Sequence, residues 1–182
     1  MGVTFEVIVG EPIDEDAFVV TSDLDGSLQR LARMKAISIA ERYPTALVLS
    51  ADTVVVNNAQ KTLGKPVDRD DAKSMLLELS GCKHTVFTGV ALTCREQKFC
   101  QSVTIGTDVY FRDLSTDEID WYLNSNEPYD KAGAYGIQGK AMIFVDKIVG
   151  CFYNVVGLPV RGTIDLFYKF ALRKEPQNVG KN

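Results

Sequence analysis

The sequence contains only one histidine, and this scarcity argues against most of the histidine chemistry that hydrolases use. His84 lies in the strand-like run Lys83–Phe87, where a place on the strand face is a better interpretation than a catalytic base. The four cysteines are widely spaced and form no C-x-x-C pair: Cys82, Cys94, Cys100 and Cys151. We therefore expect no cysteine–histidine zinc site, and we predict reduced thiols in a cytoplasmic protein.

Signals for several other protein classes are also missing. Lysine and arginine total 20 against 24 aspartates and glutamates, so no excess of positive charge is available to coat a nucleic-acid polymer. No apolar run approaches the roughly 20 residues of a membrane span, and the N-terminus lacks a signal-peptide pattern. Neither a P-loop nor a G-x-G-x-x-G run before a helix is present. Walker-type NTPases and dinucleotide-dependent oxidoreductases are therefore not expected.

The most informative stretch is the apolar run Ala46–Val56, which carries one carboxylate, Asp52. Eight of its eleven residues are apolar, a composition typical of a strand buried on both faces in the centre of an α/β sheet. A carboxylate is costly to bury without partners, so the sheet opens at Asp52 or a cation meets it. The alternative is a strand that ends at Ser50, with Asp52 in a solvated turn.

The rest of the chain alternates strand and helix patterns, and its 182 residues fit one domain or a two-lobed domain. Further strands are expected at Val3–Val9, Thr62–Leu63, Thr85–Thr93, Ser102–Phe111, Ala141–Val149 and Cys151–Val156. We expect Thr62–Leu63 to form a hairpin with Val54–Val56, the next two strands to form an antiparallel pair, and the last two to pair around Gly150. Helices are expected at Ser27–Arg42, from the cap Asp68 to Ser80, after the capping box Ser115–Glu118, and at Val160–Leu172. The segment Gly10–Asp25 is acidic and irregular.

Several charged residues stand out from these elements. Lys35 falls on the apolar stripe of its helix, where it either passes along the edge of the core or points into a cleft. Lys65 is held between Gly64 and Pro66, the residue types that most release and most restrict the backbone. In the acidic loop, Glu15 is either solvated or a ligand of a metal.

A second unusual stretch, residues 126–139, combines three glycines with Lys131, Tyr135 and Gln138. Gln138 offers a donor and an acceptor, as reading the edge of a nucleobase requires. Carboxylates and lysines without histidine suit hydrolysis of a phosphate ester or phosphoanhydride. Carboxylates hold Mg²⁺ or take a proton from water, and lysines offset phosphate charge.

The motifs, taken together, resemble the Maf family of nucleotide pyrophosphatases. They appear in the family's order: Ser50-Ala51-Asp52-Thr53-Val54-Val55-Val56, Gly64-Lys65-Pro66, Leu79-Ser80-Gly81, Thr88-Gly89-Val90-Ala91, Asp130-Lys131-Ala132-Gly133-Ala134-Tyr135-Gly136-Ile137-Gln138-Gly139 and Asn154-Val155-Val156-Gly157-Leu158-Pro159. The resemblance runs from about Gly2 to the last helix. The run Ala134–Gly139 is similar to the branch that acts on dTTP and UTP, rather than the branch that acts on 7-methyl-GTP.

The resemblance implies one α/β domain over 1–182, a two-lobed mixed sheet with flanking helices and a central cleft, akin to the inosine triphosphate pyrophosphatases. It implies cleavage of a nucleoside triphosphate, including modified pyrimidine nucleotides, to the monophosphate and pyrophosphate with Mg²⁺ or Mn²⁺. Asp52 would accept the proton and lie near the metal with Glu15. Lys35 and Lys65 would face the phosphates, and the substrate would contact three further residues: Thr53, Lys131 and Gln138.

One departure from the family concerns the N-terminus. Members usually begin with a strand and a Ser-x-Ser-Pro-Arg-Arg loop that leads into a helix, whereas Met1–Phe5 corresponds to the segment after that helix. We expect the strand, loop and helix to be absent, and with them an arginine and N–H donors for the phosphates. Either the full gene product carries them, or catalysis is weakened. A non-catalytic nucleotide-binding protein is the alternative function, and the sheet edge left exposed favours a homodimer.

Overall fold

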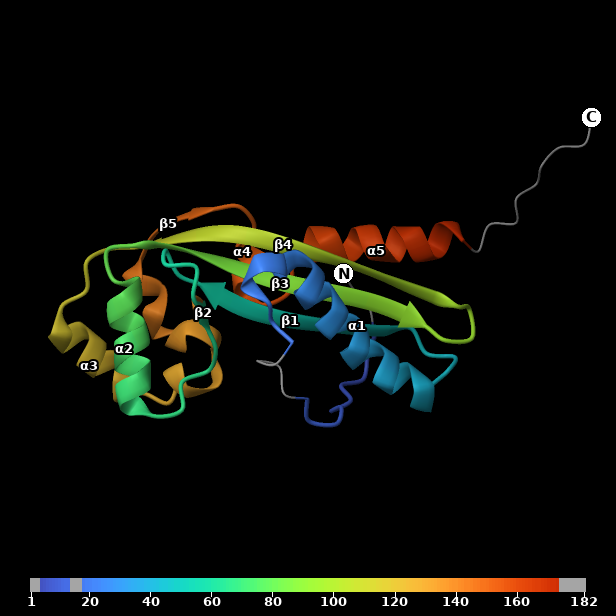
Figure 1. Cartoon of the computed structure of the whole chain (residues 1–182), viewed down its shortest axis with the longest axis horizontal. Coiled ribbons are helices and arrows are strands. Elements are labelled where there is room, and N and C mark those ends of the chain that lie inside the picture. Colours follow the sequence, from blue (N-terminus) through green and yellow to red (C-terminus); the bar gives the residue numbers. More distant parts are fainter. Residues whose placement is uncertain (1–3, 14–17, 174–182) are drawn as a thin grey trace, which may run out of the picture.

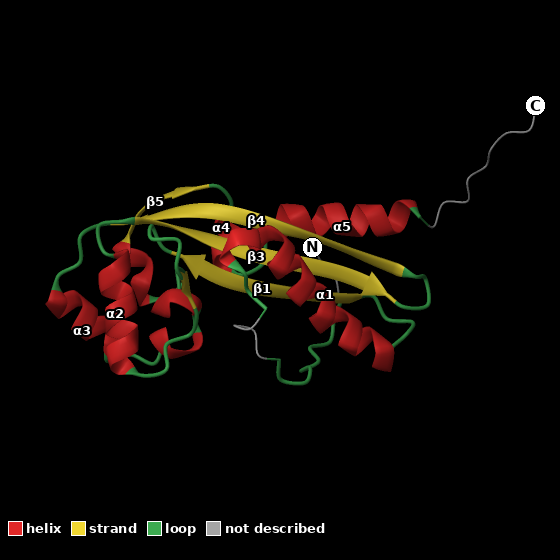
Figure 2. Ribbon diagram, in the orientation of Figure 1, coloured by secondary structure: helices red, strands yellow, loops and turns green. Residues whose placement is uncertain are grey.

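The computed structural model describes residues 4–13 and 18–173, and within them it forms one five-stranded sheet with helices on both faces (Figures 1 and 2). The strands are β1 (Val48–Val56), β2 (Thr62–Leu63), β3 (Lys83–Cys94), β4 (Phe99–Phe111) and β5 (Val145–Val149). The α-helices are α1 (Leu24–Arg42), α2 (Arg69–Leu79), α3 (Thr116–Leu123), α4 (Phe152–Val156) and α5 (Val160–Leu172). Short 3₁₀ turns are η1 (Thr21–Asp23), η2 (Pro128–Asp130), η3 (Ala132–Ala134) and η4 (Lys140–Phe144).

The sheet order is β2-β1-β3-β4-β5, and every pairing in it is antiparallel. Helix α1 covers one face, where the Thr104 hydroxyl of β4 donates to the Asp25 carbonyl. Helix α5 covers the other face, where Gly162 approaches Val103 and Ile105. Because strand side chains alternate between faces, neighbouring residues of β1 meet different helices.

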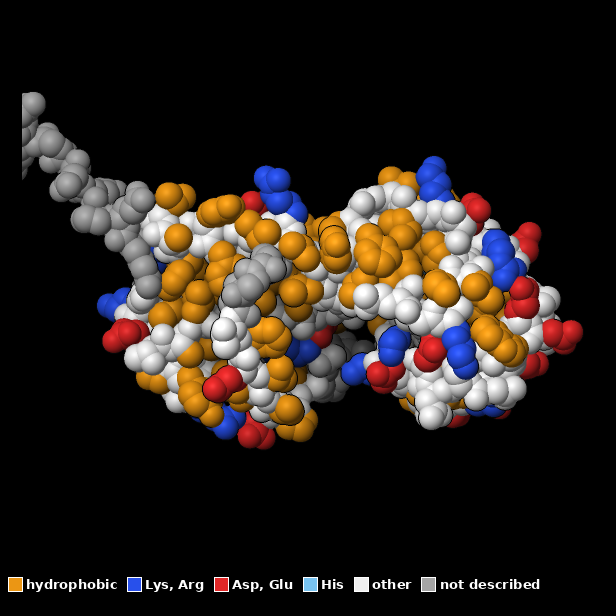
Figure 3. All heavy atoms as spheres, turned by 180° about the vertical axis from the view of Figure 1, so that it is seen from behind, with side chains coloured by type: hydrophobic (Ala, Val, Ile, Leu, Met, Phe, Trp, Pro, Cys, Tyr) orange, Lys and Arg blue, Asp and Glu red, His pale blue; other side chains and the backbone are white. Residues whose placement is uncertain are grey.

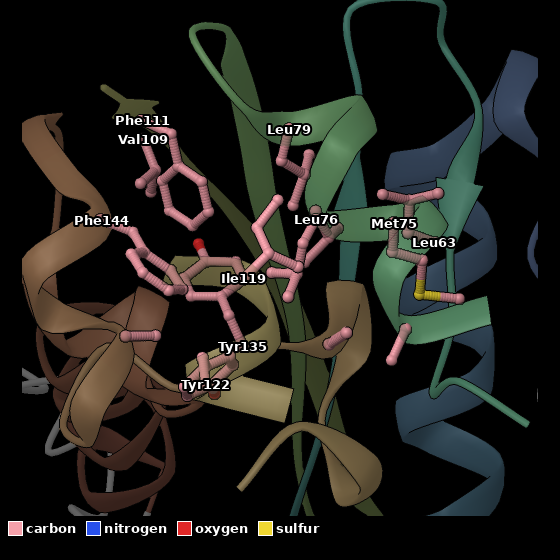
Figure 4. Close-up of a cluster of buried hydrophobic side chains, with 14 of the residues drawn as sticks. Leu63, Met75, Leu76, Leu79, Val109, Phe111, Ile119, Tyr122, Tyr135 and Phe144 are labelled. Carbon is pink, nitrogen blue, oxygen red and sulfur yellow. The ribbon is translucent and has the colours of Figure 1, made fainter. Parts of the chain in front are cut away.

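The molecule has two lobes with a hollow between them (Figure 3). The helical lobe consists of α2, α3, the turns of residues 128–144 and the nearby ends of the strands. Its core includes Phe111, Tyr122, Tyr135 and Phe144, whose rings meet edge to face (Figure 4). The sheet lobe consists of α1, α4, α5 and the rest of the sheet. Strands β3 and β4 run through both lobes and connect them.

Most of the predicted elements are confirmed. The hairpin of β1 and β2, the antiparallel pair of β3 and β4, and α5 lie where the sequence places them. Asp68 caps α2 by accepting from Asp71 N–H, Gly81 has a φ of 63°, and Ser115 with Glu118 forms the capping box of α3. Helix α1 begins three residues earlier than predicted, because Asp23 caps it by accepting from Gly26 N–H.

Two strand predictions are wrong. Residues 4–9 pair with no strand in the described part of the chain, and Phe5, Val7 and Val9 are exposed, because an alternating pattern forms a strand only beside a partner. The segments predicted as Ala141–Val149 and Cys151–Val156 do not pair with each other. The first is the turn η4 followed by β5, which pairs with β4, and the second is the helix α4.

Burial along β1 is also less uniform than expected. Val54, Val55 and Val56 are buried, but the first half of the strand is half-buried or exposed. The difference follows from pairing, since β2 joins β1 only at Val55 and Val56. Among the helices that the structure describes, none has the length and apolar character that crossing a membrane requires.

Candidate functional site

A cleft of about 2020 Å³ lies between the two lobes (Figure 3). The sheet lobe contributes Lys35 from α1 and Asp52 and Thr53 from β1 to its lining. The helical lobe contributes Lys65, Lys131 and Gln138, which lie on loops. The structure thus brings together six of the seven residues that the sequence singles out. The seventh, Glu15, lies outside the described residues.

Asp52 lies on the α1 face of β1 and is only 8% exposed. Its Oδ1 accepts a hydrogen bond from Lys35 Nζ, whose side chain is 23% exposed. Lys35 therefore points toward the sheet and the cleft rather than along the edge of the core. The pair places a carboxylate and an ammonium group side by side, largely shielded from solvent, where electrostatic interactions are stronger than at the surface.

Two small residues hold α1 close enough to the sheet for this contact. The Ser50 hydroxyl donates to the Ala32 carbonyl at 2.5 Å, one helical turn before Lys35. Gly89 of β3 is the register partner of Asp52, and a Cβ there would lie 2.6 Å from the Leu28 carbonyl oxygen. A larger residue at position 89 would push the helix away from the strand that carries Asp52.

Thr53 faces α4, on the opposite side of the sheet from Asp52. Its hydroxyl oxygen lies 2.9 Å from that of Thr88, its register partner on β3. The Thr88 hydroxyl donates to the main-chain carbonyl of Asn154 at 3.3 Å. Asp52 and Thr53 line the same cleft from opposite faces, so the cleft opens around the edge of β1.

Two loops of the helical lobe are joined beside the cleft. Gly133, which has a φ of 69°, donates its N–H to the Gly64 carbonyl at 3.0 Å, next to Lys65. Lys131 Nζ donates to Asp130 Oδ1 at 2.5 Å. The hydrogen bond from Lys131, with the positive charges of Lys131 and Lys65, lowers the pKa of the Asp130 carboxyl. The loops thus present two cations and one carboxylate to the cleft.

Gln138 is exposed in the cleft, but the backbone before it is anchored. The Tyr135 hydroxyl lies 2.8 Å from His84 Nε2, and Gly136 N–H donates to the Tyr122 hydroxyl at 3.3 Å. Burial lowers the pKa of His84 to about 4, raises that of Tyr135, and raises that of Tyr122 to about 12. These groups are therefore neutral at physiological pH and serve as fixed supports for the loop.

Comparison of the sequence with known proteins identifies the family to which the chain belongs. The family model described as Maf-like protein matches residues 1–170. The chain belongs to the Maf family. It is 45% identical over 170 residues to a dTTP/UTP pyrophosphatase of Symbiobacterium thermophilum, an alignment that covers 93% of this chain and 85% of the relative. It is 45% identical over 171 residues to the dTTP/UTP pyrophosphatase of Vibrio cholerae, covering 93% and 89%.

A third relative extends the agreement to another bacterial genus. The dTTP/UTP pyrophosphatase of Bacillus cereus is 46% identical over 160 residues, which span 87% of this chain and 80% of the relative. The fold class predicted from the Maf motifs, an α/β sheet flanked by helices, is confirmed by the structure and by the family match. Sequence similarity thus covers both lobes and the cleft between them.

The donor set of this Maf family member suits a hard divalent cation. The described residues contain no group of three or more histidine, cysteine, aspartate or glutamate side chains that could hold a metal unaided. Mg²⁺ commonly uses only one or two carboxylates and takes its other ligands from water and substrate phosphates. Asp52, a carboxylate that lines the cleft, fits that pattern.

Sequence reasoning missed four residues that build the site of this Maf family member: Ser50, Thr88, Gly89 and Asn154. All four lie in motifs that carry the family resemblance, but the motifs give no role to these individual members. Asn154 stands alone as a polar residue in an apolar run. An isolated amide among buried apolar residues is the signal that could have marked it, because such a group needs partners.

Proposed function

We propose that this chain hydrolyses dTTP and UTP, and modified pyrimidine nucleoside triphosphates, to the monophosphate and pyrophosphate. The observation that supports it most is the Asp52–Lys35 pair, shielded at the wall of a cleft whose opposite wall carries Lys65 and Lys131. A buried carboxylate facing two further lysines suits an anionic substrate and a water nucleophile. The relatives named dTTP/UTP pyrophosphatase supply the substrate class.

In this reaction Asp52 accepts the proton of the attacking water. The water oxygen forms a bond to the α-phosphorus, the bond from that phosphorus to the bridging oxygen breaks, and pyrophosphate leaves with the electron pair. Lys35 holds the Asp52 carboxylate in place and offsets negative charge as the bond forms. Lys65 and Lys131, on the opposite wall, bind oxygens of the leaving pyrophosphate as point charges.

A divalent cation, Mg²⁺ or Mn²⁺, completes the proposal. Asp52 would hold it together with phosphate oxygens of the substrate, and Glu15 is the second carboxylate that the sequence offers. When bound, such an ion neutralises phosphate charge and polarises the phosphorus centre.

We further propose that Thr53 and Gln138 contact the nucleoside. Gln138 has both a carboxamide donor and an acceptor, and its side chain is exposed in the cleft. Uracil and thymine present two carbonyl acceptors, and the Gln138 carboxamide can donate to either of them. Thr53 lies on the other wall, one residue from Asp52.

The test is a panel assay of the purified chain with dTTP, UTP, CTP, ATP and GTP in Mg²⁺ or Mn²⁺. We expect monophosphate and pyrophosphate from dTTP and UTP, with loss of turnover when the metal is chelated. In ¹⁸O-labelled water the label should enter the monophosphate. Label in pyrophosphate would contradict attack at the α-phosphorus. Thermal stabilisation by nucleotides without turnover would instead support a non-catalytic nucleotide-binding protein.

We also propose a homodimer that forms through the edge of β1. In the described part of the chain, Val48–Ser50 pair with β3 on one side and with no strand on the other. An unpaired edge with exposed Leu49 invites strand addition by a second copy. Light scattering should give the mass of a dimer, and Leu49→Lys should shift it to a monomer while Leu77→Lys, on exposed α2, should not. A monomeric wild type would contradict the proposal.

Three further features are proposed from the same observations. We propose one domain, because β3 and β4 pass through both lobes. A cytoplasmic location is consistent with four free thiols. The net charge of −4 favours small nucleotides over nucleic-acid polymers as partners, and no membrane partner is proposed.

A further inference from the structure

Thr53, Thr88 and Asn154 form a row of hydrogen-bonding groups that favours one direction of proton donation. The Asn154 main-chain carbonyl can only accept, so the hydrogen bond there requires Thr88 to donate. The 2.9 Å contact between the Thr53 and Thr88 hydroxyls allows either one to donate. Since a hydroxyl has one proton, a Thr88 that donates to Asn154 must accept from Thr53. Thr53 thus uses its only proton inside the protein. Toward the cleft its oxygen presents lone pairs alone.

Asn154 is held firmly enough to impose this direction. Its Nδ2 donates to the Val86 carbonyl at 2.9 Å and to the Thr107 hydroxyl at 3.1 Å. The opposite amide orientation would set two acceptors against each other at Val86. The main-chain carbonyl of Asn154 also accepts from Gly157 N–H at 3.0 Å. Both side-chain and main-chain atoms of this residue are therefore fixed in the protein interior.

The side-chain oxygen of Asn154 provides a second indication that this position is strongly constrained. It is buried and has no hydrogen-bond partner among the described residues. Leaving a buried carbonyl without a hydrogen-bond partner destabilises the folded state. The surrounding contacts therefore hold the residue in a position that its own side chain does not favour, as is common where a group serves a site.

We propose that Thr88 and Asn154 are positioning residues that keep Thr53 as an acceptor, and that Thr53 thereby selects pyrimidines with an N–H at ring position 3. The inference rests on the proposed hydrolysis of dTTP and UTP. These two substrates share the imide N–H, but dTTP lacks the 2′-hydroxyl, and the 3′-hydroxyl is common to all nucleotides. Cytosine has an unprotonated nitrogen at position 3, which would face the lone pairs of Thr53 and leave both groups unpaired.

The first test compares the preference for UTP over CTP, measured as a ratio of kcat/KM values, in variants of β3. Thr88→Val keeps the shape but frees the Thr53 proton to point into the cleft, so the preference should fall about tenfold, the factor of one neutral hydrogen bond. Thr88→Ser should preserve the preference. Thr93→Val is the matched control, because Thr93 is a buried threonine of the same strand whose hydroxyl bonds to the Phe99 carbonyl instead. It should leave the preference unchanged.

The second test uses the wild-type chain and needs no variant. With 3-methyl-UTP, which lacks the donor, kcat/KM should fall at least about tenfold relative to UTP. With 5-methyl-UTP, which keeps the donor, it should remain close to that of UTP. This comparison tests the requirement for the N–H at position 3 even if Thr88→Val does not fold.

The outcomes separate the inference from the proposed function. A wild type that hydrolyses no triphosphate would overturn both. An active wild type that accepts 3-methyl-UTP as readily as UTP, or a folded Thr88→Val with an unchanged preference, would overturn the inference alone. A loss of activity toward UTP and CTP in equal proportion would identify Thr88 as merely structural and would also overturn it.

Discussion

The two walls of the cleft are built in different ways. In the sheet lobe, Asp52 and Lys35 belong to the regular elements β1 and α1, and they contact each other away from solvent. In the helical lobe, Lys65, Lys131 and Gln138 lie on loops that glycine and buried tyrosines hold in place. The group that we propose as proton acceptor therefore lies on rigid elements, whereas the groups that we propose to contact different parts of the substrate lie on loops.

Replacement of Lys35 should give the largest combined effect, because it removes the cation that contacts a shielded carboxylate. Lys35→Ala should lower kcat/KM for dTTP at least about 100-fold and destabilise the fold by about 3 kcal/mol. Urea unfolding and steady-state kinetics measure both. Lys73→Ala is the control, since Lys73 pairs with Asp120 outside the cleft. Unchanged stability in Lys35→Ala would show that the pair does not hold the sheet lobe together.

Acidification should weaken the helical lobe through His84. Burial lowers its pKa from 6.5 to about 4, so below pH 6.5 the unfolded state binds a proton that the folded state excludes. Stability is complete above pH 6.5, declines as the pH falls to about 4, and loses about 3 kcal/mol in total from this group.

Urea midpoints of the wild type and His84→Gln, measured between pH 7.5 and 4.5, isolate this effect. Even if the variant starts from a lower stability, the difference in slope between the two proteins reports the histidine. Parallel pH profiles would mean that His84 is not held neutral.

Gly89→Ala tests how closely α1 must approach the sheet. The new Cβ would lie 2.6 Å from the Leu28 carbonyl oxygen, so the helix or the strand must shift. We expect the shift to lower the free energy of unfolding by about 2 kcal/mol and to move Lys35 away from Asp52. Differential scanning calorimetry and kinetics detect the two consequences. Gly10→Ala, where a Cβ would have only ordinary contact with Ile39, should change neither. Full activity in Gly89→Ala would show that catalysis does not require this close approach of α1 to the sheet.

Substitution of a lysine on the loop wall of the cleft should change the affinity for substrate rather than the stability of the fold. Lys131→Met should raise KM for dTTP about tenfold and leave the unfolding midpoint unchanged, because its ion pair with Asp130 is largely exposed. Lys83→Met removes a comparable surface pair with Asp108 outside the cleft and should affect neither quantity. A large loss of stability in Lys131→Met would contradict the prediction that the loop wall contributes to substrate affinity and not to stability.

Much of this arrangement can be predicted from sequence, because local signals determine it. Asp68 and the Ser115–Glu118 box mark the starts of their helices, and the apolar run around Asp52 marks β1. Asp52 and Lys35 can be found in the sequence because a charged side chain in an apolar run or on an apolar helix face is unfavourable without a partner of opposite charge.

The errors arise where distant contacts decide the structure. Phe5, Val7 and Val9 alternate as a strand does, yet a strand needs a neighbour that no local pattern reveals. Phe152–Val156 is rich in residues that favour strands but forms a helix, in which Asn154 bonds to Val86 and Thr107 on two separate strands. The close approach of α1 to the sheet likewise depends on a contact between Leu28 and Gly89, which lie 61 positions apart in the sequence.

The most direct test of the central claim is the activity of Asp52→Asn, a change that keeps the size of the side chain and its contact with Lys35 but removes the proton acceptor. With Asp146→Asn on exposed β5 as the control, we predict that kcat for dTTP falls at least about 1000-fold in Asp52→Asn, with an unfolding midpoint that shows a folded protein. Full activity in a folded Asp52→Asn would contradict the assignment of Asp52 as the base.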